Sequence, residues 1–149
     1  MLPGDIPRLR QFWEEHWGGG EMIVHGAVFR PEQLEGFVVD DWVGVATYIL
    51  SKDECEIISL DSLDEGRGIG TALVEAVREE ACNRQCRRVF LSTSNDNLRA
   101  LGFYQKRGFE LVTIRRGAID ESRKLKHGIP LVGNNGIPLR DEIELEMRL

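Results

Sequence analysis

Three glycines, Gly66, Gly68 and Gly70, stand at alternate positions directly before a stretch with helical periodicity. A strand that runs through such a loop into a helix directs unpaired backbone N–H groups and the positive end of the helix dipole at one point, which suits a phosphate or pyrophosphate. Taken alone, the spacing is equally compatible with a plain turn. No Gly-Lys-Ser/Thr follows, and a meander precedes the loop, so a P-loop and a Rossmann fingerprint are both disfavoured.

Hydrophobic periodicity predicts the elements that must hold this loop. Strands are expected at Met22 to Phe29, Gly36 to Val39, Trp42 to Leu50, Glu54 to Leu60, Arg88 to Thr93, Phe109 to Ile114 and Glu142 to Leu149. Helices are expected to begin near Ile6, after the glycine loop, and at Asn95 or Asn97. The last three strands before the loop are predicted to form an antiparallel meander, and the loop is predicted to lie within a βαβ unit.

The segment from Arg115 to Pro138 is predicted to be irregular, because glycine, proline and asparagine are frequent in it. An ordered loop of that length is more often functional than idle. Cations gather beside it, at Arg115, Arg116, Arg123, Lys124 and Lys126. They are interpreted as a solvated face, with contact to a phosphate or an anionic acceptor as the alternative.

Length, charge and cysteine content exclude several classes of protein. A chain of 149 residues is expected to form a single domain over residues 1–149. The formal net charge of −6 argues against a nucleic-acid partner. No apolar run approaches the roughly 20 residues that cross a bilayer, so no membrane partner is expected. Cys55, Cys82 and Cys86 do not complete a metal site, so we expect no metal, free thiols and a cytoplasmic location.

Two stretches, SLDSLDEGRGIGTALVEAV and NDNLRALGFYQKRGFE, resemble the motifs of the GNAT superfamily of N-acetyltransferases. The first family motif is Arg/Gln-x-x-Gly-x-Gly/Ala, and the second is Asn-x-x-Ala-x-x-x-Tyr-x-x-x-Gly-Phe. The second is matched by Asn97, Ala100, Tyr104, Gly108 and Phe109. The resemblance runs from about Gly36 to the C-terminus. It implies an α/β (α+β) fold with a mixed, mostly antiparallel central sheet flanked by helices.

The resemblance also implies a cosubstrate, acetyl-CoA. In the family the loop amides hold the pyrophosphate, which here implies Glu65, Gly66, Arg67, Gly68, Ile69, Gly70 and Thr71. The strand before the loop splays from its neighbour and pairs with the pantetheine arm through its backbone, which implies Leu60, Asp61 and Ser62. Asn97 is implied to bond the same arm, with a helix cap as the alternative.

Two features depart from the family pattern. Glu65 is a carboxylate where the family usually places a cation or an amide, so we expect it to point to solvent while Arg67 supplies positive charge. Family members usually begin with a strand before the first helix, whereas only Met1 to Gly4 precede it here. The sheet is therefore expected to lack its first edge strand, unless that strand belongs to a longer chain.

Direct attack of an amine on the thioester is the chemistry that the resemblance implies. Because the amine is an ammonium ion at neutral pH, a carboxylate is expected to take its proton. Glu54 and Glu56 lie two apart on one strand and face the same side, and Glu56 is preferred because it is nearer to the splay. The alternative is that both are solvated. Tyr104 is implied to protonate the departing thiolate, with simple packing as its alternative.

The acceptor is less clearly marked than the coenzyme. Acidic composition favours a cationic amine, on a small molecule or a protein, and Trp17 before Gly18 is a candidate wall of its pocket, with packing as the alternative. Family members often pair through C-terminal strands, which makes a homodimer through Glu142 to Leu149 a further expectation. Two other functions stay open, namely a non-catalytic coenzyme A-binding regulatory module and a protein-interaction domain in which the glycines are only turn residues.

Overall fold

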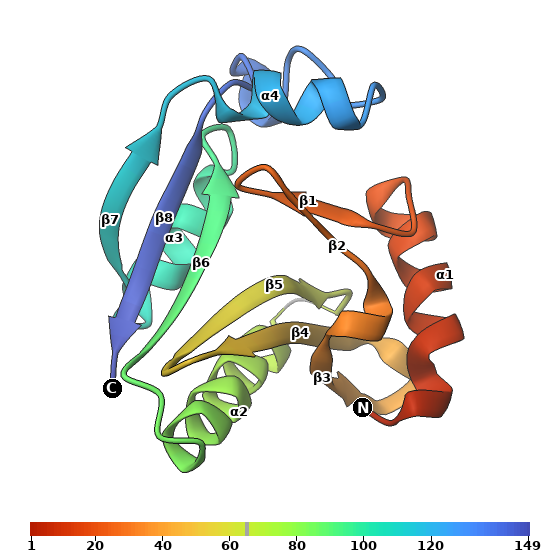
Figure 1. Ribbon diagram of the computed structural model, residues 1–149, viewed down its shortest axis with the longest axis vertical. Coiled ribbons are helices and arrows are strands. Elements are labelled where there is room, and N and C mark those ends of the chain that lie inside the picture. Colours follow the sequence, from red (N-terminus) through yellow and green to blue (C-terminus); the bar gives the residue numbers. More distant parts are fainter. Residues whose placement is uncertain (65) are drawn as a thin grey trace. The chain divides into compact units, whose positions relative to one another are not determined.

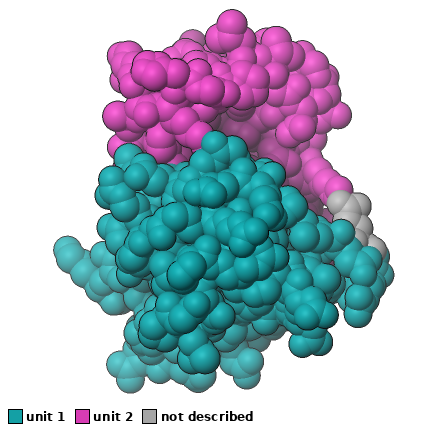
Figure 2. Space-filling view, turned by 90° about the vertical axis from the view of Figure 1, so that its right-hand side faces the viewer, with its two compact units in different colours: residues 1–22, 28–89, 149 teal, residues 23–27, 90–148 magenta. Residues whose placement is uncertain are grey.

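The computed structural model describes residues 1–64 and 66–149, so the predicted coenzyme contact Glu65 lies outside the described residues (Figure 1). The chain forms two compact units (Figure 2). The first comprises residues 1–22, 28–89 and 149, and the second comprises residues 23–27 and 90–148. The prediction that residues 1–149 fold as one domain stays a prediction.

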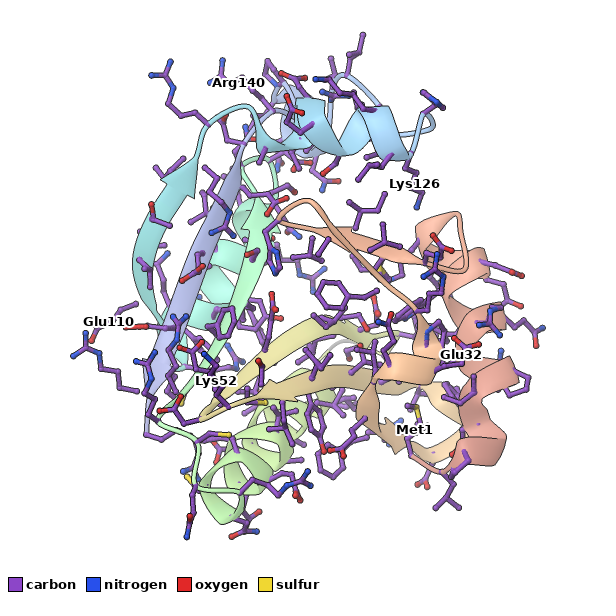
Figure 3. All side chains as sticks on the ribbon, in the orientation of Figure 1. Met1, Glu32, Lys52, Glu110, Lys126 and Arg140 are labelled. Atoms are coloured by element: carbon purple, nitrogen blue, oxygen red, sulfur yellow. The ribbon has the colours of Figure 1, made fainter. Side chains whose placement is uncertain are left out.

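The first unit begins with helix α1 (Ile6–Trp17), which follows a 3₁₀ turn at Pro3–Asp5. One stripe of α1 is buried, through Leu9, Phe12 and Trp13, and the helix ends at Gly18 in the left-handed conformation. Among the described residues no strand precedes α1. The N-terminal ammonium group of Met1, the residue labelled in Figure 3, instead donates a hydrogen bond to the carbonyl of Gly36, at 2.8 Å.

The sheet of the first unit is the predicted antiparallel meander, which is confirmed. It consists of β3 (Glu35–Val39), β4 (Gly44–Ser51) and β5 (Glu54–Ser62), followed by the first residues of β6 (Arg88–Ser94). Helix α2 (Ile69–Asn83) packs on β3, β4 and β5. It buries the apolar residues Ile69, Leu73, Val74, Val77 and Ala81. A bulge interrupts the β4–β5 register between Thr47 and Tyr48.

The second unit contains the remainder of β6, with β8 (Glu142–Arg148) beside it and β7 (Glu110–Arg115) at the edge. Strands β7 and β8 are antiparallel. Helix α3 (Leu98–Lys106) supplies Tyr104 to the core of this unit, where Phe109 and Leu145 are also buried. The strand orders of both units confirm the predicted mixed, mostly antiparallel sheet flanked by helices.

One predicted strand, Met22 to Phe29, is instead a hairpin of β1 (Met22–Val24) and β2 (Ala27–Phe29). Between them His25 has a φ of +42° and Gly26 a φ of +79°. Positive φ at both central residues is the conformation that a two-residue hairpin turn requires. The prediction missed the turn because His25-Gly26 is a weaker turn signal than Asn-Gly or Asp-Gly.

The prediction that residues 115–138 are irregular is wrong in part, because the segment contains helix α4 (Ala118–Leu125). Gly117 precedes the helix in the left-handed conformation, with a φ of +74°. Acidic residues occupy the first turn and basic residues the last turn, which favours the helix dipole. The glycines and prolines beyond Leu125 dominated the prediction and concealed this short helix.

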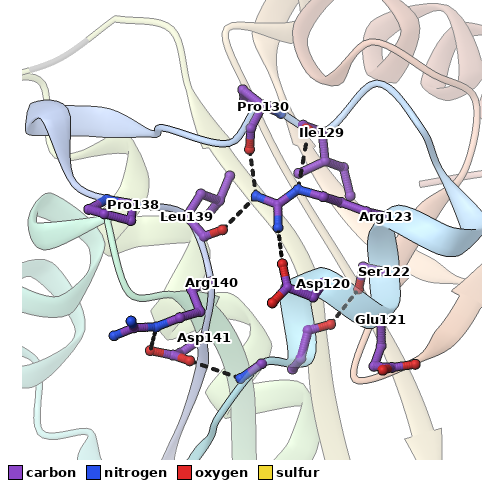
Figure 4. A network of polar contacts seen from close by, with 12 residues as sticks. Asp120, Glu121, Ser122, Arg123, Ile129, Pro130, Pro138, Leu139, Arg140 and Asp141 are labelled. Carbon is purple, nitrogen blue, oxygen red and sulfur yellow. Dashed lines mark hydrogen bonds and ion pairs between the residues drawn. The ribbon is translucent and has the colours of Figure 1, made fainter.

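The guanidinium group of Arg123 contacts the segment after α4 (Figure 4). Arg123 donates to the carbonyls of Ile129, Pro130 and Leu139 and forms an ion pair with Asp120. Its side chain is only 15 % exposed. This partly buried cation thus ties the returning chain to α4, and the segment also contains a 3₁₀ turn at Asn134–Gly136.

Candidate functional site

The glycine loop leads into the N-terminus of α2. Gly66 and Gly68 have φ values of +83° and +72°, and Gly68 is the N-cap residue. No described atom lies within 4 Å of a Cβ built at either position, so backbone conformation rather than space accounts for the glycines. Among the described residues no side chain caps α2, and its first turn carries no acidic residue. Its first N–H groups are therefore suited to an anion.

Arg67, the predicted source of positive charge in the loop, is paired within the loop itself. Its guanidinium donates to Asp64 at 2.8 Å, and both side chains are largely exposed. This hydrogen bond raises the pKa of Arg67. An exposed pair of this kind contributes little stability, so an incoming phosphate would compete with Asp64 at small cost.

The predicted pantetheine strand is the last part of β5. Leu60, Asp61 and Ser62 lie opposite Ala46, Val45 and Gly44 of β4. Gly44 faces α2, because a Cβ there would lie 2.4 Å from Cγ2 of Ile69. Val45 and its partner Asp61 therefore face the opposite side of the sheet.

All three carboxylates of β5 lie on this face, away from α2. Glu56 lies opposite Ile49, and Glu54 lies opposite Ser51. Because β4 alternates from Val45 through Ile49 to Ser51, these partners share the face of Asp61. The extra residue of the bulge belongs to β5 and leaves the alternation of β4 intact.

The two predicted bases, Glu54 and Glu56, differ in their surroundings. Glu54 forms ion pairs with the guanidinium groups of both Arg87 and Arg88. Its side chain is 23 % exposed, whereas Glu56 is 6 % exposed. Glu54 is therefore a neutralised carboxylate, and Glu56 is a buried one.

Asp61 was predicted to act through its backbone, but its side chain also has a defined partner. The indole N–H of Trp17 donates to both carboxylate oxygens, at 3.2 and 3.1 Å. Burial raises the pKa of Asp61, while the Trp17 hydrogen bond and the charge of His16 act in the opposite direction. This contact joins the end of α1 to the end of β5, two segments 44 residues apart in sequence.

The predicted site residues of the second unit are Asn97 and Tyr104. The Asn97 side chain accepts a hydrogen bond from the N–H of Ala100 at 3.1 Å and caps α3. Its helix-cap alternative is thus present in the structure. Tyr104 is 8 % exposed and packs edge-on against Phe103 and Phe109. The packing alternative for Tyr104 is thus present in the structure, and its predicted role as an acid stays a prediction that rests on the family motif.

A buried polar cluster in the second unit was not predicted. Both oxygens of Glu142 accept the backbone N–H of His25, each at 3.1 Å, and Arg115 lies 3.5 Å away. Arg115 also donates to Glu144 and to Ser92. The signal available in sequence is the alternation of Glu142 and Glu144 with apolar residues, which places both carboxylates on one face of β8.

A surface pocket of the second unit is lined by Arg116, Gly117, Arg140 and Asp141. Asp141 accepts the N–H of Gly117 at 2.9 Å, and this bond lowers the pKa of its carboxyl, helped by Arg140. None of the predicted site residues lines this pocket. Across residues 1–64 and 66–149, no cluster of three or more histidine, cysteine or acidic side chains could hold a metal ion. No helix in these ranges is both long and apolar enough to cross a membrane.

The sequence of this chain is similar to a known protein family and to a protein of Bacillus subtilis. The model of the acetyltransferase (GNAT) family matches residues 7–109. The uncharacterized protein YdhI of Bacillus subtilis is 44% identical over 139 residues, which cover 91% of this chain and 87% of that protein.

Two solved structures share the fold. One is a Bacillus subtilis acetyltransferase in complex with CoA, with a TM-score of 0.69 and 20% identity over 100% of this chain and 94% of that chain. The other is described as an IAA acetyltransferase from Bacillus cereus, with a TM-score of 0.70 and 23% identity over 99% and 93% of the two chains.

Proposed function

The chain belongs to the acetyltransferase (GNAT) family, and on this basis we propose that it is an acetyl-CoA-dependent N-acetyltransferase. Its acceptor is a primary amine of a small molecule or a protein, which attacks the thioester directly in a ternary complex. The observation that carries the proposal is the left-handed pair Gly66 and Gly68, which leads into the N-terminus of α2. Such an end binds a diphosphate through backbone N–H groups and the helix dipole.

The coenzyme half of the proposed site lies in the first unit. The loop residues Gly66 to Thr71 hold the diphosphate, with Arg67 released from Asp64 to assist. The backbone of Leu60 to Ser62 pairs with the pantetheine arm. A fold relative crystallised with CoA supports this assignment, since its structure covers the whole of this chain.

In the proposed reaction an acceptor ammonium first loses a proton to a carboxylate. The neutral amine then attacks the carbonyl carbon of the thioester, a C–N bond forms, and the C–S bond breaks as the tetrahedral intermediate collapses. The departing thiolate takes a proton from Tyr104, and the nitrogen gives its second proton to the resulting tyrosinate, which restores the neutral side chain. Glu56 is the preferred base, because it lies nearer than Glu54 to the end of β5 that is proposed to pair with pantetheine.

Acetyl-CoA binding is the first test. Acetyl-CoA is expected to raise the melting temperature of the wild-type protein, and Gly68→Ala is expected to weaken this effect. Gly117→Ala is a matched control, since Gly117 also precedes a helix with positive φ and open space at its Cβ position. It should lose similar stability without losing coenzyme affinity. No thermal shift at acetyl-CoA concentrations far above micromolar would count against the coenzyme site and favour an interaction domain.

Turnover is the second test, with a panel of amines and detection of the released thiol. Amine-dependent release supports the enzyme, whereas coenzyme binding without release for any amine supports a regulatory module. Tyr104→Phe should lower kcat with little change in coenzyme affinity, and an unchanged rate would remove Tyr104 as the acid. Glu56→Gln should depress activity most near neutral pH, because fewer amine molecules are then neutral.

A further inference from the structure

The carboxylate of Asp61 accepts its side-chain hydrogen bonds from an indole N–H, whereas Asp64 and Glu54 accept theirs from guanidinium groups. Trp17 is the last residue of α1 and is 45% exposed, yet its N–H is directed at both oxygens of Asp61. An indole N–H is a single neutral donor, which two carboxylate oxygens share here. Most of the hydrogen-bonding capacity of this carboxylate remains available to a ligand.

The charge of Asp61 is also poorly compensated by the protein. Among residues 1–64 and 66–149, no lysine or arginine forms an ion pair with Asp61, whereas Asp64 has Arg67 and Glu54 has two guanidinium groups. His16, one residue before Trp17, is the cation-forming side chain that acts on it. A partly buried carboxylate without a lysine or arginine partner keeps its charge and acceptor capacity available to a cationic ligand.

We infer that Asp61 and Trp17 form a binding site for an alkylammonium group of the acceptor. The carboxylate accepts charge-assisted hydrogen bonds from the ammonium, and the exposed indole offers its π-face to the same cation. The inference rests on the proposed function, because it places the acceptor on the strand whose backbone is proposed to pair with pantetheine. Asp61 binds and positions the acceptor here, and Glu56 remains the proposed proton acceptor.

The site has a defined pH dependence. Asp61 on β5 faces two side chains of α1, those of Trp17 and His16. As pH falls, Asp61 takes up a proton and loses the negative charge that would bind an ammonium ion. The KM for the amine should therefore rise at low pH, while the affinity for acetyl-CoA should not follow it.

The experiment combines a direct binding readout with kinetics. The indole N–H signal of Trp17, assigned by its loss in Trp17→Phe, is followed by NMR while 1,4-diaminobutane is added, with 1-butanol as the uncharged control. We expect a saturable shift with the diamine in the wild-type protein and in Glu54→Gln, and no shift in Asp61→Asn. For the amine with the highest turnover, Asp61→Asn should raise KM by about 10-fold to 100-fold, as for loss of one charged hydrogen bond. Its kcat and coenzyme affinity should stay within about twofold.

The outcomes separate this inference from the proposed function. If the wild-type protein turns over an amine but Asp61→Asn keeps the same KM, the ammonium site is wrong and the acetyltransferase proposal stands. If no amine is acetylated but the diamine shifts the Trp17 signal only when Asp61 is present, the cation site stands and the proposed function fails. Retained acetyl-CoA binding in Asp61→Asn shows that the variant is folded. An equal shift with 1-butanol would overturn the inference, because it would show that charge is not recognised.

Discussion

The two ends of β5 carry carboxylates on the same face of one sheet, and the protein treats their charges differently. At the first end, Glu54 forms ion pairs with Arg88, the first residue of β6, and with Arg87, the residue before it. At the other end, Asp61 has the neutral indole of Trp17. Glu54 is thus paired with two cations of the fold, whereas Asp61 has unused acceptor capacity and no lysine or arginine partner among the described residues.

This difference shows why residue type and spacing alone do not identify a functional carboxylate. Glu54 stands in the position of a plausible base in sequence, but its carboxylate already forms ion pairs with two structural cations. Asp61 was predicted to act only through its backbone, yet its side chain has the environment expected of a ligand site. The partners of a carboxylate, which lie far away in sequence, decide its role.

The largest expected effect comes from disturbing the packing of α2 on the sheet, at the end of β5 that carries Asp61. In Gly44→Val the new Cβ would begin 2.4 Å from Ile69, which lies in the first turn of α2. We expect a loss of about 1–3 kcal/mol in the free energy of unfolding, measured with urea, together with weaker acetyl-CoA binding. Gly128→Ala, where a Cβ meets nothing within 4 Å, is the control and should leave both unchanged. Wild-type stability in Gly44→Val would show that β4 and α2 are not packed as described.

An intermediate effect is expected at the Glu54 end. Glu54→Gln keeps the shape but removes the charge that faces Arg87 and Arg88, and the Arg88 side chain is only 14% exposed. Loss of this pairing should cost about 1 kcal/mol of stability, with kcat changed less than about threefold. A large loss of kcat with normal stability would instead make Glu54 the base and reverse the comparison between the two ends.

The smallest effect is expected for the stability of Asp61→Asn, and its sign is the informative part. The pKa of Asp61 is raised in the folded protein above the ordinary value of 3.8. The folded state therefore holds this proton more tightly than the unfolded state, and wild-type stability falls as pH rises from about 3.8 through the raised pKa. The amide of the Asp61→Asn variant cannot titrate, so urea unfolding across this range should show a gain of the variant over the wild type that grows with pH. A gain that shrinks with pH would mean that Asp61 has a cationic partner.

Much of the fold could be predicted from local patterns. The meander of β3, β4 and β5 was predicted because turn residues separate short β-branched runs, and α2 was predicted because its apolar residues recur at helical spacing. The hairpin at His25-Gly26 and the helix α4 were missed, since their signals are short and lie beside stronger glycine and proline signals. Local patterns resolve an element only where it is long enough to show its period.

The sequence by itself determined the glycine loop, its place between β5 and α2, and the family motifs that carry the proposed chemistry. These are local features, because a left-handed glycine and a helix N-terminus act through neighbouring residues. Only the tertiary structure decided which carboxylates are neutralised. Glu54 meets Arg87 and Arg88, and Asp61 meets Trp17, across more than 30 residues of chain in each case. Charge compensation acts through space over a few ångströms, so it depends on packing that no spacing in the sequence records.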